Sequence, residues 1–180
     1  DIKKYINQIA FSGAEEFVEK YMKDDKDSQI IGHFGLGFYS SYMVADLVEI
    51  KTLSYKEGSK AVHWTCDGST TYSIEASDKT DIGSEIILHV NEENEEYLNE
   101  WKITELLTKY CKYYSTEIYL HKTKTEKEKD KDGKEIEDGK ETTSIVPELM
   151  NETHPIWNKN PAELKDEDYK EFYRKEYPMK

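Results

Sequence analysis

The chain opens with apolar residues at the spacing of an amphipathic helix. They recur at every third or fourth position and therefore share one helix face: Ile2, Tyr5, Ile6, Ile9 and Ala10. Ser12-Gly13 interrupts this spacing, which returns from Ala14 until the charged run 23–28 breaks it. The pattern predicts a helix of about two and a half turns, a glycine hinge and a second helix.

Helical spacing resumes over residues 39–45, after a glycine-rich segment at 32–38, and from Leu47 the apolar period becomes two. Residues 61–66 and 70–76 flank Asp67-Gly68, which is a hairpin signal, and residues 82–90 form a further apolar run. Because no helix pattern separates these runs, the sequence predicts an antiparallel meander.

A further amphipathic helix is predicted between Tyr97 and Tyr114, followed by a short strand at 117–121. Charged residues then dominate 122–141, which predicts a linker or a solvated hairpin with Asp132-Gly133 at its tip. Apolar residues return from Val146, and residues 166–177 are again helical in spacing. The order of elements predicts an α+β fold, a two-layer sandwich of helices on an antiparallel sheet.

Composition narrows the classes of function. The 180 residues hold 25 Lys plus Arg and 38 Asp plus Glu, a net charge of −13, which argues against nucleic acid and anionic membranes as partners. No apolar run reaches the roughly 18 residues that a membrane helix needs, and Cys66 and Cys111 suggest neither a disulfide framework nor a zinc site. We expect a cytoplasmic protein. Because the chain begins with Asp1 inside a helix pattern, we also expect it to be cut from a longer one.

The glycine-rich segment is the strongest candidate for chemistry. It reads Gly32-His33-Phe34-Gly35-Leu36-Gly37-Phe38, and its glycines permit positive φ and a close approach of a ligand to the backbone. A helix beginning at Gly37 would direct free N–H groups to the same place, as phosphate sites require. The spacing matches neither the dinucleotide fingerprint nor the P-loop. A glycine turn used only for helix packing is the alternative.

Other residue patterns suggest no catalytic or metal site. The five histidines show no ligand spacing, and the acidic run 92–96 suits a helix start. Ser12 and Ser40 have no His or Asp at a suggestive position. We therefore assign no catalytic residue and no metal ligand.

Several segments resemble, in order, the ninety-kilodalton heat-shock chaperones, in particular their bacterial HtpG type. The run from Ile31 to Asp46 is similar to the second glycine box of that family, and Ile9 to Gly13 to its lid. Further matches are Asp67-Gly68, residues 83–89, the helix around Trp101 and residues 155–161. The resemblance spans nearly the whole chain except the charged stretch.

The resemblance implies an ATP-binding domain of the split-ATPase class, the GHKL or Bergerat type shared with type II topoisomerases, MutL proteins and histidine kinases, here incomplete at its N-terminus. Residues 1–121 would be its C-terminal part, with the lid at about 9–31, 122–145 the charged linker or hairpin, and 146–180 the start of the middle domain. The implied nucleotide-binding residues are Ser12, Gly13, Gly32, His33, Phe34, Gly35, Leu36, Gly37, Phe38 and Ser84. Ser84 stands where the family usually has a Thr near the adenine.

The same resemblance implies an ATP-dependent chaperone that binds unfolded client proteins, forms a homodimer through regions beyond this chain, and uses ATP or ADP with Mg²⁺ held by residues upstream. The family's catalytic Glu and its DxGxG motif do not occur in this sequence, and Phe11 and His33 replace the usual Lys and Gln. We therefore expect no ATP turnover by the stretch alone. The alternatives are a noncatalytic acidic interaction module and another ATPase of the same class.

Overall fold

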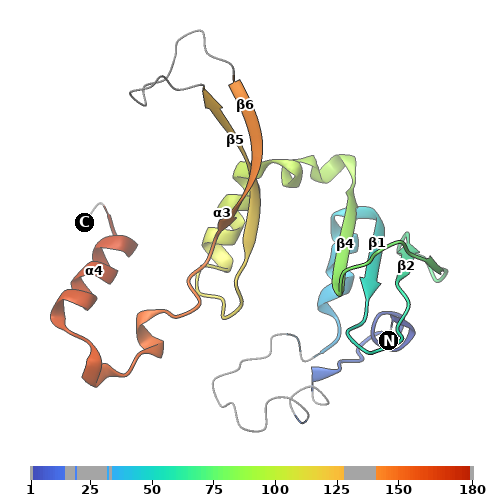
Figure 1. Ribbon diagram of the computed structural model, residues 1–180, viewed down its shortest axis with the longest axis horizontal. Helices are drawn as coiled ribbons and strands as arrows, with labels where there is room; N and C mark the ends of the chain where they lie inside the picture. Colours follow the sequence, from blue (N-terminus) through green and yellow to red (C-terminus); the bar gives the residue numbers. More distant parts are fainter. Residues whose placement is uncertain (1, 15–18, 20–31, 33, 128–140, 179–180) are drawn as a thin grey trace. The chain divides into compact units, whose positions relative to one another are not determined.

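The computed structural model describes residues 2–14, 19, 32, 34–127 and 141–178. The chain divides into two compact units, Asp1–Asn99 and Glu100–Lys180, which are taken here one at a time (Figure 1). Both combine helices with antiparallel strands, so the predicted α+β class is confirmed.

The first unit is built on a four-stranded antiparallel sheet. Its strands are β1 (Ala45–Leu53), β2 (Val62–Cys66), β3 (Ser73–Ala76) and β4 (Gly83–Val90). The order is β3-β2-β1-β4, so β4 pairs with β1 and not with β3. The predicted meander is therefore wrong in this step, because pairing depends on the apolar face that β4 shares with β1 rather than on chain order.

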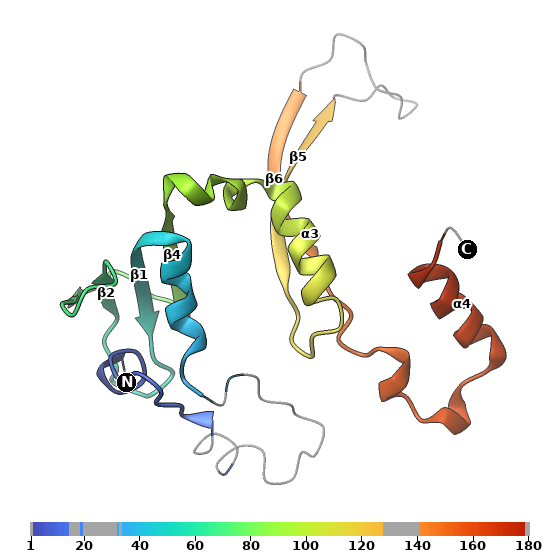
Figure 2. The same ribbon diagram turned by 180° about the vertical axis from the view of Figure 1, so that it is seen from behind.

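Short helices cover one face of this sheet, on which the core lies. Ala45, Val48, Ile50 and Trp64 are buried there, and Val48 has no exposed surface. The 3-10 helix η1 (Gly37–Met43) adds Phe38 and Tyr42, and the first helix α1 (Ile2–Tyr5) adds Ile2. Seen from opposite sides, Figures 1 and 2 show η1 against a single face of the strands.

The N-terminal helix is shorter than predicted. α1 ends at Tyr5, and Ala10 has a positive φ of 59°, which an α-helix does not allow. Tertiary contacts explain the early end: Trp64 Nε1 donates to Asn7 Oδ1 at 3.0 Å, and the Tyr39 hydroxyl donates to the Ile6 carbonyl. Most of the second predicted helix lies outside the described residues.

The second unit begins with α3 (Glu100–Tyr110), and the 3-10 helix η2 (Glu92–Leu98) precedes it in the first unit. β5 (Tyr119–Lys127) and β6 (Glu141–Leu149) form an antiparallel pair, whose arms include residues predicted as linker or hairpin. Short 3-10 helices η3 (Ile156–Asn158) and η4 (Pro161–Glu163) lead to α4 (Asp166–Glu176). Of these three helices, α4 is the one that the sequence predicted. The predicted hairpin tip lies outside the described residues, and the domain boundaries at 121/122 and 145/146 stay predictions.

An aromatic cluster and one buried amide organise the second unit. The Tyr113 and Trp157 rings are 4.6 Å apart, and Trp157 and Phe172 of α4 are 5.9 Å apart, both edge to face. Asn151, only 8% exposed, accepts a hydrogen bond from Ile118 N at 2.7 Å. Its Nδ2 donates to the carbonyls of Tyr114 and Thr116 at 2.8 Å. This one side chain therefore holds the loop between α3 and β5.

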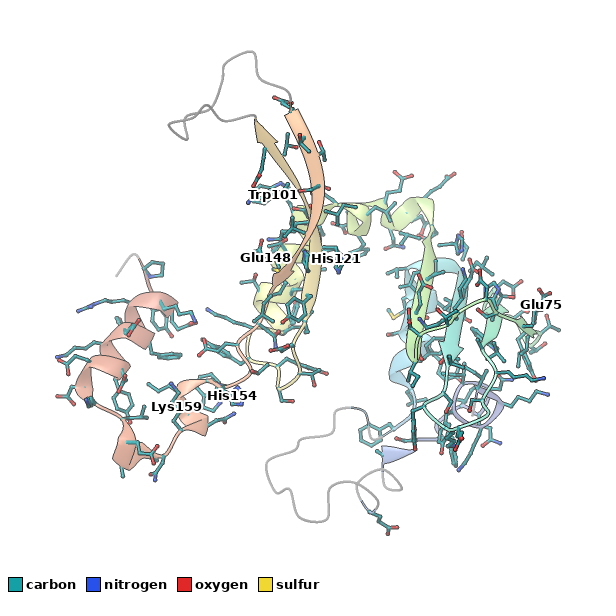
Figure 3. The ribbon with its side chains drawn as sticks, in the orientation of Figure 1. Glu75, Trp101, His121, Glu148, His154 and Lys159 are labelled. Carbon is teal, nitrogen blue, oxygen red and sulfur yellow. The ribbon has the colours of Figure 1, made fainter. Side chains whose placement is uncertain are left out.

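The described helices include none that is long and apolar enough to cross a membrane. Exposed apolar side chains do occur, such as Trp101 of α3, which is 83% exposed (Figure 3). A single exposed tryptophan of this kind is ordinary on a folded surface.

Replacing Asn151 by alanine tests the role of this amide. Asn151→Ala leaves one backbone N–H and two carbonyls without their partner, so we expect a loss of about 2–4 kcal/mol in unfolding free energy. Asn160→Ala is the matched control, because it removes a single exposed bond to Ala162 N and should cost about 1 kcal/mol or less. Urea unfolding followed by circular dichroism measures both, and equal losses would contradict the assignment.

Candidate functional site

The glycine segment forms a turn that needs glycine at two positions. Gly32 has φ of 103° and Gly35 has φ of 63°, and L side chains rarely adopt either conformation. The turn ends at Gly37, where η1 begins as predicted. The helix is of 3-10 type and seven residues long, so its dipole is small. His33 lies outside the described residues.

The backbone of Phe11 packs directly on Gly35. A Cβ built on Gly35 would lie 2.3 Å from the Phe11 carbonyl oxygen and 2.8 Å from its nitrogen, closer than real atoms approach. Ser12 Oγ donates to the Gly32 carbonyl at 3.0 Å, and Ala14 N donates to Ser12 Oγ at 3.2 Å. The structure thus brings Ser12, and with it the adjacent Gly13, to the glycine turn. The sequence predicted these residues and the turn as two separate segments.

Core aromatic residues anchor the turn to the sheet. The Phe38 ring lies 5.8 Å from that of Trp64, at an interplanar angle of 67°. Ser40 Oγ donates to the Gly37 carbonyl at 2.6 Å, which closes the first turn of η1. Burial raises the pKa of Tyr39 and of Tyr42, so both phenols stay neutral and keep their hydrogen for donation.

Ser84 lines an open pocket of about 770 Å³ in the first unit. Its hydroxyl is 2.7 Å from Thr52 Oγ1, and Thr52 Oγ1 also donates to the Gly83 carbonyl at 3.2 Å. The rest of the lining is mixed. It includes apolar residues such as Ile2, Val62 and Ile74 and the three lysines Lys3, Lys56 and Lys60. A pocket of this size and mixed lining suits a small-molecule ligand.

Gly13 connects the two parts of the candidate site. It lines the pocket together with Ser84, and it follows Ser12, which is bonded to Gly32. Among the described contacts, none joins Ser84 directly to residues 32–38. The role of each predicted residue in ligand binding stays a prediction.

Sequence reasoning missed Thr52, although the signal was present. Thr52 alternates with Lys51 in the period-two pattern and so lies on the same face as Val48 and Ile50. That β4 would place Ser84 opposite Thr52 could not be predicted, because the pairing of β4 with β1 joins segments about thirty residues apart.

The core face of the sheet continues onto β4 and is open there. Ile86 pairs with Ile50 and Leu88 with Val48, so all four lie on one face. Unlike the two buried residues of β1, Ile86 is 55% exposed and Leu88 is 38% exposed. Within the described part of the chain no cluster of His, Cys, Asp and Glu is arranged to hold a metal ion. The site therefore offers backbone groups, hydroxyls, lysine side chains and apolar surface.

Comparison with known proteins defines the class of protein to which this chain belongs. The sequence model of the Hsp90 protein family matches residues 124–177. The resemblance to the ninety-kilodalton heat-shock chaperones is confirmed, and the chain belongs to that family.

Within the family the chain matches proteins named chaperone protein HtpG. It is 54% identical over 179 residues to that of Porphyromonas gingivalis and 51% identical over 179 residues to that of Bacteroides thetaiotaomicron, in each case over 99% of this chain. Identity to the HtpG of Borreliella burgdorferi is 40% over 175 residues, 97% of this chain. The aligned stretch is 24% of the first two relatives and 27% of the third, so the chain spans about a quarter of their length.

Gly35→Ala tests the contact between the turn and Phe11. The added methyl meets strain from positive φ and a clash with the Phe11 backbone, and we expect a loss of about 2–4 kcal/mol in unfolding free energy. Gly58→Ala is the matched control, because Gly58 has φ of 75° but no heavy atom within 4 Å of the Cβ position. It should lose only about 1 kcal/mol. Urea unfolding gives both values, and similar losses would show that Phe11 does not press on Gly35.

Proposed function

We propose that the chain is part of an ATP-dependent molecular chaperone and supplies the lid and the phosphate-binding glycine box of a split-ATPase nucleotide site. The observation that carries this proposal is the packing of the Phe11 backbone on Gly35, with Ser12 bonded to Gly32. A segment that rests on a glycine turn in this way can close over a ligand held by the turn.

The glycine turn fits a chain of phosphates. At Gly32 and Gly37, no described atom lies within 4 Å of the Cβ position, so the backbone there is open to a ligand. Backbone N–H groups in such a turn bind phosphate oxygens without a basic side chain. Phosphate binding by residues 32–38 is therefore compatible with a net charge of −13.

The pocket at Ser84 fits the other end of a nucleotide. The Thr52 and Ser84 hydroxyls offer hydrogen-bond donors and acceptors, and Val62 and Ile74 line the same pocket. A purine base needs both an apolar surface and a few polar partners at its edge. In the proposed arrangement these residues hold the base, and Gly13 lies between the base and the glycine turn.

The remaining parts of the proposal rest on the family. ATP or ADP would bind with Mg²⁺, whose protein ligands we place outside this sequence. Clients would be unfolded proteins, and the homodimer would form through other regions of the whole protein. A cytoplasmic location completes the proposal. Phosphoryl transfer needs a positioned base and metal ligands, and we assign neither role to a residue of this chain.

Hydrogen exchange tests nucleotide binding by the chain. A nonhydrolysable ATP analogue, at a concentration on the order of millimolar, should protect the amides of residues 34–38 from exchange. Ser84→Ala should raise the analogue concentration needed for half protection about three- to tenfold, because it removes one hydroxyl partner. Ser73→Ala is the matched control, since Ser73 lies on the opposite face of the sheet and should leave the concentration unchanged. Absence of protection in the unmodified chain would favour the acidic interaction module.

Steady-state phosphate release tests the expected lack of turnover. The 180-residue chain should release no phosphate from ATP above background, because no catalytic base or metal-ligand set is assigned to it. Gly37→Asp provides the control, because the Cβ position of Gly37 is open and a carboxylate there would repel bound phosphates. Release that is present in the unmodified chain and lost in Gly37→Asp would contradict the expectation.

A further inference from the structure

The ammonium group of Lys4 is held beside the segment that packs on the glycine turn. Lys4 Nζ lies 4.9 Å from the centre of the Tyr5 ring and 5.4 Å from the centre of the Phe11 ring. It also donates a hydrogen bond to the Tyr5 hydroxyl at 3.2 Å. Both ring distances fall within the roughly 6 Å over which an aromatic face attracts a cation. The two rings and the hydroxyl therefore position the charge, and none of these three groups neutralises it.

The two aromatic rings are themselves fixed on the candidate site. The Tyr5 and Phe11 rings are 5.7 Å apart. A Cβ built on Gly13 would lie 2.7 Å from Tyr5 Cε1, so the Tyr5 ring rests directly on the backbone of Gly13. The Phe11 backbone rests in the same way on Gly35. The position of Lys4 thus follows from two close backbone contacts, one at Gly13 in the pocket lining and one at the glycine turn.

A positive charge at this place matters because the chain as a whole is strongly acidic. A net charge of −13 repels an anionic ligand at long range. Phe11, whose backbone contacts the turn, carries no charge of its own. At physiological ionic strength a charge acts over a screening length of about 8 Å, so only a local cation can offset the repulsion. Lys4 places such a cation where the Phe11 segment meets the turn.

We propose that Lys4 is a phosphate-binding residue of the candidate site and supplies a positive charge to a polyphosphate chain held by the backbone of residues 32–38. This inference rests on the proposed function, because it requires that the turn bind phosphates. The ammonium sits on a flexible four-carbon stem, which lets it turn from the aromatic rings toward a phosphate oxygen. The resulting hydrogen bond is charge-assisted and adds to those from the backbone N–H groups.

The proposed role makes the contribution of Lys4 depend on the phosphates of the ligand and not on its base. A nonhydrolysable ATP analogue and inorganic tripolyphosphate both carry a chain of three phosphates, so both should bind more tightly when Lys4 is present. Tripolyphosphate has no base to occupy the pocket at Ser84. Comparison of these two probes therefore separates the turn from the pocket.

Lys4→Gln tests the proposal, because it removes the charge and keeps a polar side chain. Hydrogen exchange of amides 34–38 in the 180-residue chain, followed while either probe is added, gives the concentration for half protection. We expect Lys4→Gln to raise this concentration about fivefold for both probes, the effect of losing one charged contact. Lys4→Arg keeps the charge and should stay within about twofold of the unmodified chain.

Lys51→Gln is the matched control. It removes the same charge from β1, where Lys51 alternates with Ile50 and Thr52 and so lies on the opposite face of the sheet. It should change the concentration for half protection less than about twofold. Without a probe, amide exchange in Lys4→Gln should equal that of the unmodified chain, because the Lys4 side chain is exposed.

Three results would overturn this proposal and leave the proposed function intact. Equal effects of Lys4→Gln and Lys51→Gln would assign the loss to net charge. An effect of Lys4→Arg as large as that of Lys4→Gln would assign it to side-chain shape. Faster exchange of Lys4→Gln without a probe would assign it to the packing of the rings. Absence of protection by either probe in the unmodified chain would instead overturn the proposed function, and this inference with it.

Discussion

The pairing of β1 on both of its edges is the constraint on which the first unit depends. β1 is bonded to β2 along one edge and to β4 along the other, and its inward face carries Val48 and Ile50. Trp64 of β2 completes this core and receives the Phe38 ring of η1. Loss of β1 would therefore remove the surface on which the glycine turn is anchored.

The glycine turn depends on this anchor at one end and on a close backbone contact at the other. Phe38 fixes the C-terminal end of the turn on Trp64, whereas Phe11 lies against Gly35 with no room for a side chain between them. A turn held at two points keeps a defined shape although its residues have few side-chain contacts of their own. Such preorganisation lowers the entropy that ligand binding would cost.

The sequence predicted the elements whose signal is local. Alternation in β1, the Asp67-Gly68 turn and the apolar stripe of α4 each depend on neighbours within a few residues, and the structure contains all three. The glycine turn and the helix start at Gly37 were also local signals.

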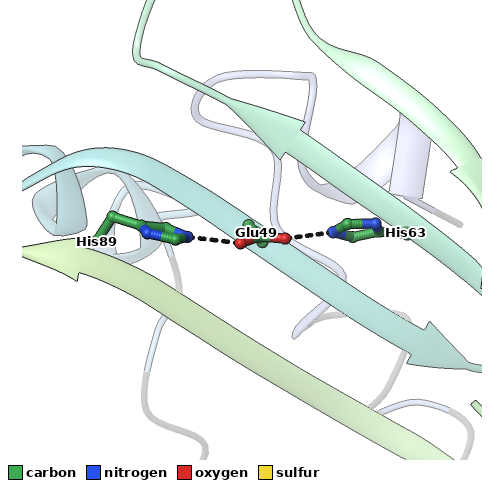
Figure 4. Close-up of polar contacts among 3 residues, drawn as sticks. All are labelled: Glu49, His63 and His89. Carbon is green, nitrogen blue, oxygen red and sulfur yellow. Dashed lines mark hydrogen bonds and ion pairs between the residues drawn. The ribbon is translucent and has the colours of Figure 1, made fainter.

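Features set by distant pairing could not be predicted in this way. The early end of α1 follows from the bond that Trp64 donates to Asn7, fifty-seven positions along the chain. The Thr52–Ser84 pair and the contact of Glu49 with His89 (Figure 4) both require the pairing of β4 with β1, which no short pattern encodes. Glu49 and His89 give no signal in the sequence, because they are forty positions apart along the chain and only the strand pairing brings them together.

The two faces of the sheet are physically connected through that same register. Thr52 and Ser84 lie opposite each other on the inward face, while Glu49 and His89 face outward from the same two strands. The pairing of β4 with β1 therefore also holds the Ser84 hydroxyl beside Thr52, and both residues line the pocket.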